Sequence, residues 1–207
     1  QLCAGENIQV VNCTTPSNYF HVLRRQMHRE FRKPLVVMTP KSLLRHKRCV
    51  SDISEFSIKS TFHRVLEDDA YNKINNLITL NKDNKIRKVV ICSGKIYYDL
   101  IDAREKSKNT DVVIARLEQL YPFPAKTLAS ILKRYKNADF IWCQEEPKNM
   151  GGWNTVRNYI DRTLEIINIK DINVKYVGRK ASSSTATGNA NKHLAQQKEI
   201  LEKVFKI

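Results

Sequence analysis

The sequence lacks features that would mark a membrane protein, a secreted protein or a disulfide-rich scaffold. No apolar run approaches the roughly 20 residues that a membrane-spanning helix needs, and no signal peptide is visible. The five cysteines are odd in number and widely spaced, and none forms a Cys-x-x-Cys pair. We therefore expect a protein of a reducing compartment with no membrane contact, no disulfide framework and no zinc site.

Motifs for self-contained catalysis are also missing. The chain holds neither a Walker motif, nor a G-x-G-x-x-G dinucleotide fingerprint, nor a G-x-S-x-G elbow. His21 and His28 could share a helical face, but arginines lie between them and would repel a metal ion. Glu145 and Glu146 would point to opposite faces of a strand, which makes them a poor acid/base pair. The sequence predicts no catalytic residue and no metal ligand.

Basic side chains outnumber acidic ones. The chain has 36 Lys and Arg against 21 Asp and Glu among its 207 residues, a formal net charge of +15. Such an excess can indicate an anionic partner, but heavy use of Lys, Asn and Ile is also typical of an AT-rich coding sequence. The basic residues are scattered, and a crowded run at 24–33 is interpreted as a solvated helix face, with Arg32 and Lys33 as exceptions because they directly precede the expected buried strand at 35–38. We expect no nucleic acid partner.

Apolar periodicity predicts strands that alternate with helices. The expected strands are 7–13, 35–38, 88–92, 111–117, 139–145 and 173–177, and the expected helices are 18–32, 97–104, 126–135, 153–167 and 191–205. The segment 47–59 has a weak pattern and is the candidate linker. Residues 121–124 should form a break after the strand at 111–117, and residues 178–189 should form a loop. The alternation predicts an α/β fold, with a mostly parallel sheet and flanking helices.

The stretch 142–153 is the most informative of the chain. An apolar run ends in two carboxylates and Pro147, a glycine pair follows, and an amphipathic segment begins at Trp153. This pattern is typical of a buried strand that leaves a sheet and leads into a helix. Because ligands and partners gather at the carboxyl ends of strands in open α/β sheets, we expect a contact surface here.

Two further segments are candidate anion sites. Ser93, Gly94 and Lys95 lie between a strand and a helix, where backbone N–H groups and a lysine could hold an anion. Arg116 stands near the carboxyl end of another strand and could clasp a phosphate or carboxylate. The alternatives are an ordinary turn for the first segment, and for Arg116 an internal ion pair with a glutamate, 118 or 145.

Several sequence blocks resemble one family. They include NCTTP, YFHVLRRQ, RKPLVVMTPKSLLRH, CSGKIYYDL, RLEQLYPFP, WCQEEPKNMGGW, GRKAS and ATG. Together they resemble the C-terminal portion of the 2-oxoglutarate dehydrogenase family, whose members depend on thiamine diphosphate. The resemblance covers essentially the whole chain, and only residues 57–86 and 163–173 diverge.

The resemblance implies a fold and a place in a longer enzyme. Residues 1–56 would be the end of a pyrimidine-binding α/β domain, and residues 57–207 a transketolase-type C-terminal domain. The chain starts with Gln1 and would be the last quarter or less of the enzyme. Thiamine diphosphate and magnesium would be bound by residues upstream, so this fragment alone would bind no cofactor and be inactive.

The family also implies an activity and partners. Its members are homodimers that oxidatively decarboxylate 2-oxoglutarate in the TCA cycle and pass the succinyl group to lipoyl-lysine of the dihydrolipoyl succinyltransferase component. Some relatives bind acetyl-CoA or a nucleotide such as AMP between their last two domains. The corresponding positions here would be Thr15, Arg32 and Arg116, with Ser93, Lys95, His63 and Arg64 as further candidates. The two arginines 32 and 116 would pair with phosphates, and the threonine would donate a hydrogen bond.

Other interpretations stay open. The segment could be purely structural, completing the dimer and docking onto the multienzyme complex. A stand-alone nucleic-acid-binding protein is a third possibility, and scattered charge argues against it. The enzyme would be located in the bacterial cytoplasm, or in the mitochondrial matrix if the source is eukaryotic, and the AT-rich residue usage favours bacteria.

Overall fold

The computed structural model describes residues 2–71, 78–169 and 173–206. Strands alternate with helices along most of the chain. The strands are β1 (Gln9–Val11), β2 (Leu35–Val37), β3 (Val65–Leu66), β4 (Lys88–Cys92), β5 (Val112–Leu117), β6 (Gln119–Tyr121), β7 (Asp139–Pro147) and β8 (Lys175–Arg179). The α-helices are α1 (Pro16–His28), α2 (Ile96–Lys106), α3 (Ala125–Leu132), α4 (Trp153–Ile166) and α5 (Ala190–Lys206). The expected α/β class is confirmed.

The larger sheet is mostly parallel, as predicted. Its strand order is β3-β5-β4-β7-β8, and only the short edge strand β3 runs antiparallel to its neighbour. Every residue of β4 and β5 is buried. Continuous apolar strands of this kind are typical of parallel sheets that are covered on both faces.

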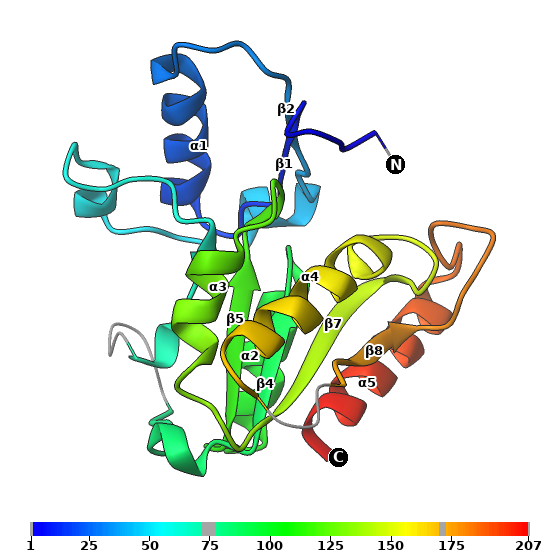
Figure 1. Cartoon of the computed structure of the whole chain (residues 1–207). Coiled ribbons are helices and arrows are strands. Elements are labelled where there is room, and N and C mark those ends of the chain that lie inside the picture. The colour runs from blue at the N-terminus through cyan, green and yellow to red at the C-terminus, as the bar shows by residue number, and fades with distance from the viewer. Residues whose placement is uncertain (1, 72–77, 170–172, 207) are drawn as a thin grey trace.

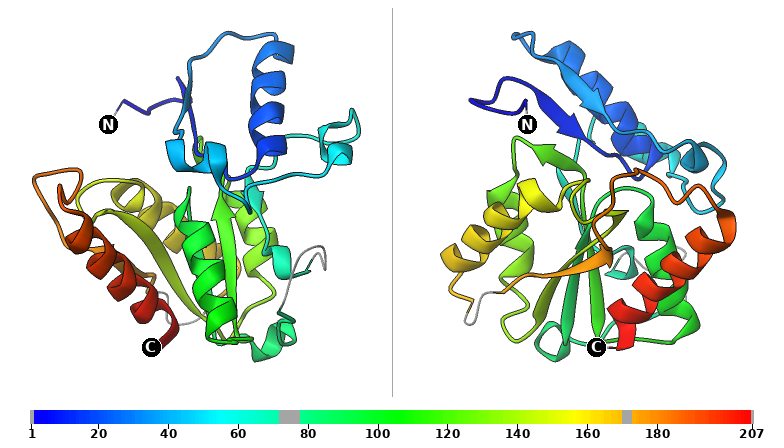
Figure 2. Two further views of the ribbon diagram at one scale, coloured as in Figure 1. Left: turned by 180° about the vertical axis from the view of Figure 1, so that it is seen from behind. Right: turned by 90° about the vertical axis from the view of Figure 1, so that its right-hand side faces the viewer.

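Helices cover both faces of this sheet (Figures 1 and 2). Val89 and Ile91 of β4 belong to the core beneath α3 and α4, whereas Val90 and Cys92 belong to the core beneath α2 and α5. This alternation follows from the strand geometry, which sends successive side chains to opposite faces. Each face of the sheet is therefore covered by two helices.

The N-terminal part forms a second, smaller sheet with the order β2-β1-β6. β1 and β2 run parallel, and α1 connects them. β6 comes from the downstream part of the chain and pairs antiparallel with β1. A small apolar core of Val11, Cys13, Val22 and Phe62 lies between this sheet and α1. The two parts of the chain are therefore joined by a shared sheet.

Some details of the sequence prediction are wrong. Tyr121 was expected to begin a break at 121–124, and residues 119 and 120 were assigned to no element, but residues 119–121 form β6, because β1 supplies a partner that is remote in sequence. β8 extends over Gly178 and Arg179, which were expected in a loop, because Arg179 pairs with Pro147 after an irregularity in β7. The boundary at 56/57 stays a prediction. Within the described ranges, no helix combines the length and apolar character that crossing a membrane would require.

Candidate functional site

A buried carboxylate lies where the two parts of the chain meet. Glu118, between β5 and β6, is 0% exposed. Its oxygens accept hydrogen bonds from the backbone N–H of Thr14 at 2.9 Å, from the hydroxyl of Thr14 at 2.5 Å and from Nδ2 of Asn18 at 2.8 Å. Burial raises the pKa of Glu118, although Arg116 and these donors act in the opposite direction. The loop before α1 and the first turn of α1 are thus tied to the end of β5.

Arg116 is enclosed beside this carboxylate. It is 1% exposed, and its guanidinium forms an ion pair with Asp69, lies 4.0 Å from the centre of the Tyr97 ring and donates to the hydroxyl of Thr14 at 3.3 Å. Burial alone would lower the pKa of Arg116, but the negative charges around it, Asp69 and Glu118 among them, raise it overall. The ion pair is therefore internal, with Asp69 and not with either glutamate that the sequence suggested.

The turn from β4 to α2 also touches the N-terminal part. Gly94 has a φ of 76°, and a Cβ there would lie 2.5 Å from Nδ2 of Asn12. The hydroxyl of Ser93 donates to the carbonyl oxygen at the end of β5 at 2.8 Å. Lys95 forms an ion pair with Glu145 at 2.5 Å. The polar side chains of this turn are thus engaged within the protein, close to the carboxyl ends of β4 and β7.

Thr15, His63 and Arg64 lie near the same contact, and Arg32 does not. The side chain of Thr15 caps α1 by accepting a hydrogen bond from the N–H of Asn18 at 3.3 Å. Asn18 in turn contacts both backbone groups of His63, at 2.8 and 2.9 Å. Arg32 is exposed beyond the opposite end of α1, a helix of 13 residues, which at roughly 1.5 Å per residue separates the two ends by about 20 Å.

A cluster of arginines beside this contact was missed by the sequence interpretation. Arg25 donates to Gln119 at 2.9 Å and to Gln9 at 3.0 Å, and Arg29 donates to the same Gln9 oxygen at 2.6 Å. Burial lowers the pKa of Arg25 to about 10, helped by the charges of Arg29 and Arg64. The run at 24–33 is therefore not simply a solvated face.

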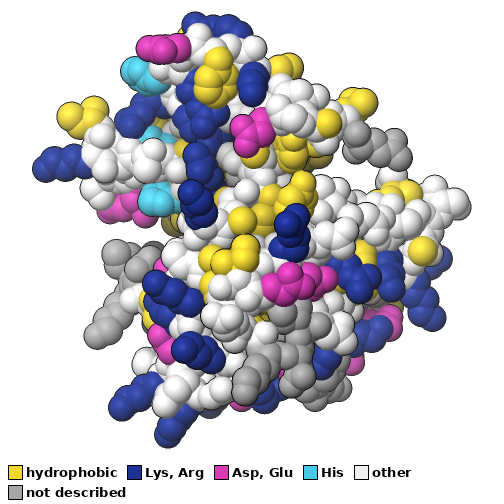
Figure 3. Space-filling view, in the orientation of Figure 1, with side chains coloured by type: hydrophobic (Ala, Val, Ile, Leu, Met, Phe, Trp, Pro, Cys, Tyr) yellow, Lys and Arg dark blue, Asp and Glu magenta, His cyan; other side chains and the backbone are white. Residues whose placement is uncertain are grey.

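We call Arg25, Arg29 and Arg64 the arginine cluster. Within the described ranges, none of the three takes part in an ion pair. Figure 3 shows a band of Lys and Arg side chains over α1. The sequence did carry a signal that Arg25 and Arg29 share the inward face of α1. They follow the buried Asn18 and Val22 at intervals of three and four residues, which is the spacing of one helical face.

The donor sets do not point to a metal. Within the part of the chain that the structure describes, no group of three His, Cys, Asp or Glu residues is arranged to hold a metal ion. The cysteines are free thiols, and burial raises the pKa of Cys92 and Cys143 above the usual value.

The mostly parallel sheet, joined to the end of a second α/β unit, is consistent with the transketolase-like class. A family model described as 2-oxoglutarate dehydrogenase C-terminal matches residues 50–205, and one described as transketolase, pyrimidine binding domain, matches residues 1–47. The chain belongs to the 2-oxoglutarate dehydrogenase C-terminal family.

Curated relatives agree with this assignment. The chain is 58% identical over 203 residues to the 2-oxoglutarate dehydrogenase E1 components of Brucella ovis and Brucella canis, an alignment that covers 98% of this chain and 20% of each relative. The chain thus spans about a fifth of the length of these relatives. The resemblance inferred from the sequence blocks is confirmed.

Proposed function

We propose that this chain is the C-terminal part of a 2-oxoglutarate dehydrogenase E1 component. The whole enzyme would oxidatively decarboxylate 2-oxoglutarate with thiamine diphosphate and magnesium, and would pass the succinyl group to lipoyl-lysine of the succinyltransferase component. The observation that carries this proposal is 58% identity over 98% of the chain. Because the relatives are bacterial, we favour the bacterial cytoplasm over the mitochondrial matrix.

The described residues do not supply a metal site that could hold the diphosphate of the cofactor. A diphosphate held through a metal ion needs a set of oxygen ligands, usually with carboxylates among them, and no group of three His, Cys, Asp or Glu in the described ranges is placed to hold a metal ion. The chemistry of decarboxylation would therefore depend on residues outside this chain. A longer chain that contains this segment should reduce ferricyanide with 2-oxoglutarate, whereas the 207-residue chain alone should not. Activity of the isolated chain would overturn this division of labour.

The role we propose for the segment is to fix the pyrimidine-binding part against the C-terminal domain, and so to shape the homodimer. Two observations support this role. Glu118 accepts hydrogen bonds from Thr14 and Asn18 of the N-terminal part, and strand β6 completes the sheet of that part. Glu118→Leu in the longer enzyme should lower the thermal midpoint and weaken the dimer in analytical ultracentrifugation. The exposed Arg162→Gln on α4 is the control and should change neither.

A second candidate function is an anionic effector site, and the arginine cluster favours it. Three guanidinium groups without carboxylate partners repel one another, so a phosphate placed among them would relieve that repulsion. The exposed His63 adjoins the cluster, whereas Thr15, Ser93, Lys95 and Arg116 are engaged in contacts behind it. Acetyl-CoA and AMP are the effectors we propose, as in the family.

Isothermal titration with acetyl-CoA and AMP tests this site. Arg64→Gln should weaken binding at least about tenfold, since one charged contact to phosphate is lost. Arg162→Gln, which removes a charge elsewhere, should bind as the parent does. No binding by the parent, with dimer assembly intact, would favour the purely structural role of the segment.

A further inference from the structure

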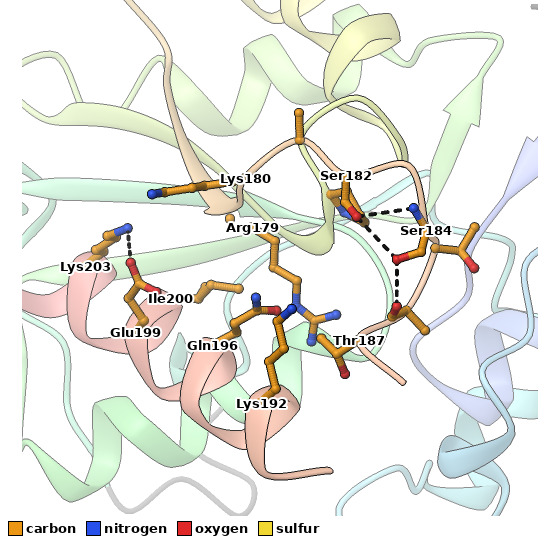
Figure 4. A pocket seen from close by; sticks show the side chains of 15 residues that line it. Arg179, Lys180, Ser182, Ser184, Thr187, Lys192, Gln196, Glu199, Ile200 and Lys203 are labelled. Atoms are coloured by element: carbon orange, nitrogen blue, oxygen red, sulfur yellow. Dashed lines mark hydrogen bonds and ion pairs between the residues drawn. The ribbon is translucent and has the colours of Figure 1, made fainter. Parts of the chain in front are cut away.

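A second charged region, remote from the arginine cluster in the fold, lies at the C-terminal end of the chain. A pocket of about 370 Å³ opens between the end of β8, the loop at 180–189 and α5 (Figure 4). Its walls carry Arg179 from β8, Lys180 from the loop, and Lys192 and Lys203 from one face of α5. Glu199 is the single carboxylate among the described residues that line it. The pocket is therefore strongly cationic.

The positive charge of the pocket is mostly uncompensated. Glu199 is already paired with Lys203 at 2.6 Å. Lys180 and Lys192 take part in no ion pair within the described ranges, although Lys180 lies near enough to Glu199 to help lower the pKa of that carboxyl, after the larger effect of Lys203. Arg179 contacts Nδ1 of His193 at 2.8 Å, and its Nε is buried with no hydrogen-bond partner among the described residues. This Nε is therefore free to donate to an acceptor in the pocket, and Oε1 of Gln196 in the same wall is buried without a partner as well.

The loop that closes the pocket is held in place. Asn149 accepts a hydrogen bond from the N–H of Ser182 at 2.9 Å and donates one to its carbonyl oxygen, also at 2.9 Å. The N–H of Ser184 then donates to the hydroxyl of Ser182 at 3.2 Å. These bonds fix the hydroxyl-rich wall opposite α5, so a ligand would meet a surface that is already ordered.

We propose that this pocket binds the phosphate group of a small phosphorylated molecule. A phosphate brings up to two negative charges and several acceptor oxygens, which matches an arginine, two lysines outside any ion pair and neighbouring hydroxyls. The walls are too polar for an apolar ligand. The volume is at the lower end of small-molecule pockets, about 300–1,000 Å³, so it suits inorganic phosphate or a nucleoside monophosphate. None of the arginine cluster contributes, so this site is separate from the proposed effector site.

The test is a titration of the 207-residue chain, followed by ¹⁵N–¹H correlation spectra at constant ionic strength. Inorganic phosphate and AMP are the two probes. Each should cause saturable shifts of backbone amides in 179–187 and 192–196. Tighter binding of AMP would show that the nucleoside is also held, and equal binding would show that the phosphate alone is recognised.

Matched variants separate a site from general attraction by charge. Lys180→Gln with Lys192→Gln should weaken binding about tenfold, because two charged contacts are lost, and Lys192→Arg should retain it. Lys198→Gln is the control, since this lysine is on the same helix, lies outside the pocket and is 78% exposed. Arg64→Gln should leave these shifts unchanged. An equal loss in Lys198→Gln, or no saturation with either probe, would overturn the proposal.

Discussion

Arg104 of α2 and Asp68 form an ion pair whose side chains are 1% and 0% exposed. The guanidinium also donates to the carbonyl oxygen of Val112 at 3.1 Å, and the carboxylate accepts from the N–H groups of Ile114 at 2.7 Å and Ala70 at 2.9 Å. The pair thus fastens the segment around β3 to both α2 and β5. Its neighbour Asp69 is thereby held in position to pair with Arg116.

Removing one partner of this pair should be strongly destabilising. Asp68→Asn leaves a buried guanidinium without its counter-charge, a change that typically costs about 3–5 kcal/mol of unfolding free energy. Urea unfolding followed by circular dichroism measures the loss. The partly exposed pair of Arg157 and Asp161, 3.8 Å apart on α4 with side chains 55% and 27% exposed, is the control. Asp161→Asn should cost less than about 1 kcal/mol, and equal losses would show that burial of the first pair is energetically unimportant.

Glu118 should give the contact between the two parts a pH-dependent stability. Burial raises its pKa above the usual value of 4.5, so the folded state holds this proton more tightly than the unfolded state. The stabilisation from Glu118 is therefore complete below pH 4.5 and falls as the pH rises through the folded pKa. Glu118→Gln removes this titration.

The measurement is the difference in unfolding free energy between the parent and Glu118→Gln across about pH 4.5 to 7, the range around the usual pKa of a carboxyl group. As the pH rises, the parent should lose stability relative to the variant. Two other buried carboxyl groups, Asp99 and Glu146, also have raised pKa values. Their contributions to the pH dependence are the same in both proteins and cancel in the difference. A constant difference, or a shift in favour of the parent, would contradict the raised pKa.

Local patterns predicted most of the larger sheet, because its strands β4, β5, β7 and β8 and the helices that cover it each carry a periodicity of their own. The strand at 88–92 was located to the residue, and α4 begins at Trp153 as expected. β3 and β6 were missed because neither is part of a longer apolar run, unlike the equally short β1 and β2, and because each depends on a remote partner, β5 or β1. Short strands of this kind have no pattern of their own that would predict them.

The candidate site was only partly accessible from the sequence, for a related reason. Arg116 was singled out correctly as a notable cation, but its partner Asp69 lies in the divergent region 57–86, where no element was predicted before the strand at 88–92. The proximity of Thr15 and Arg32 could not be judged without the direction of α1, which places them at opposite ends. Pairings between segments that are distant in the chain are a property of the tertiary structure.

Gly94 should be required where the turn after β4 approaches the N-terminal part. Gly94→Ala places a methyl group against Asn12 and also forces a φ of 76° on a residue with a Cβ. Gly188→Ala is a matched control, because its φ is 65° but nothing lies within 4 Å of the added Cβ. The control should lose about 1 kcal/mol from backbone strain, and Gly94→Ala should lose more. Equal losses in urea unfolding would show that the close approach to Asn12 costs nothing.

Gln144 organises the turn between β7 and α4 through its amide. Its Oε1 accepts hydrogen bonds from Nε1 of Trp142 at 2.8 Å and from the N–H of Trp153 at 3.0 Å, and its Nε2 donates to the carbonyl oxygens of Met150 at 2.8 Å and Pro147 at 3.1 Å. The residue is 1% exposed. Its donors and acceptors therefore cannot be replaced by water without opening the turn.

Gln144→Glu keeps the shape of the side chain but points a carboxylate oxygen at those carbonyl oxygens. We expect a loss of about 2–4 kcal/mol, the cost of a buried charged group without its donors, and a red shift of tryptophan fluorescence as the turn opens. Glu145→Gln is the control, because it breaks only the partly exposed pair with Lys95 and should cost less than about 1 kcal/mol. The loss in Gln144→Glu should also shrink at acidic pH, since protonation restores one donor and removes the buried charge. A loss that does not depend on pH would show that the damage is steric and that the amide is not the organising group.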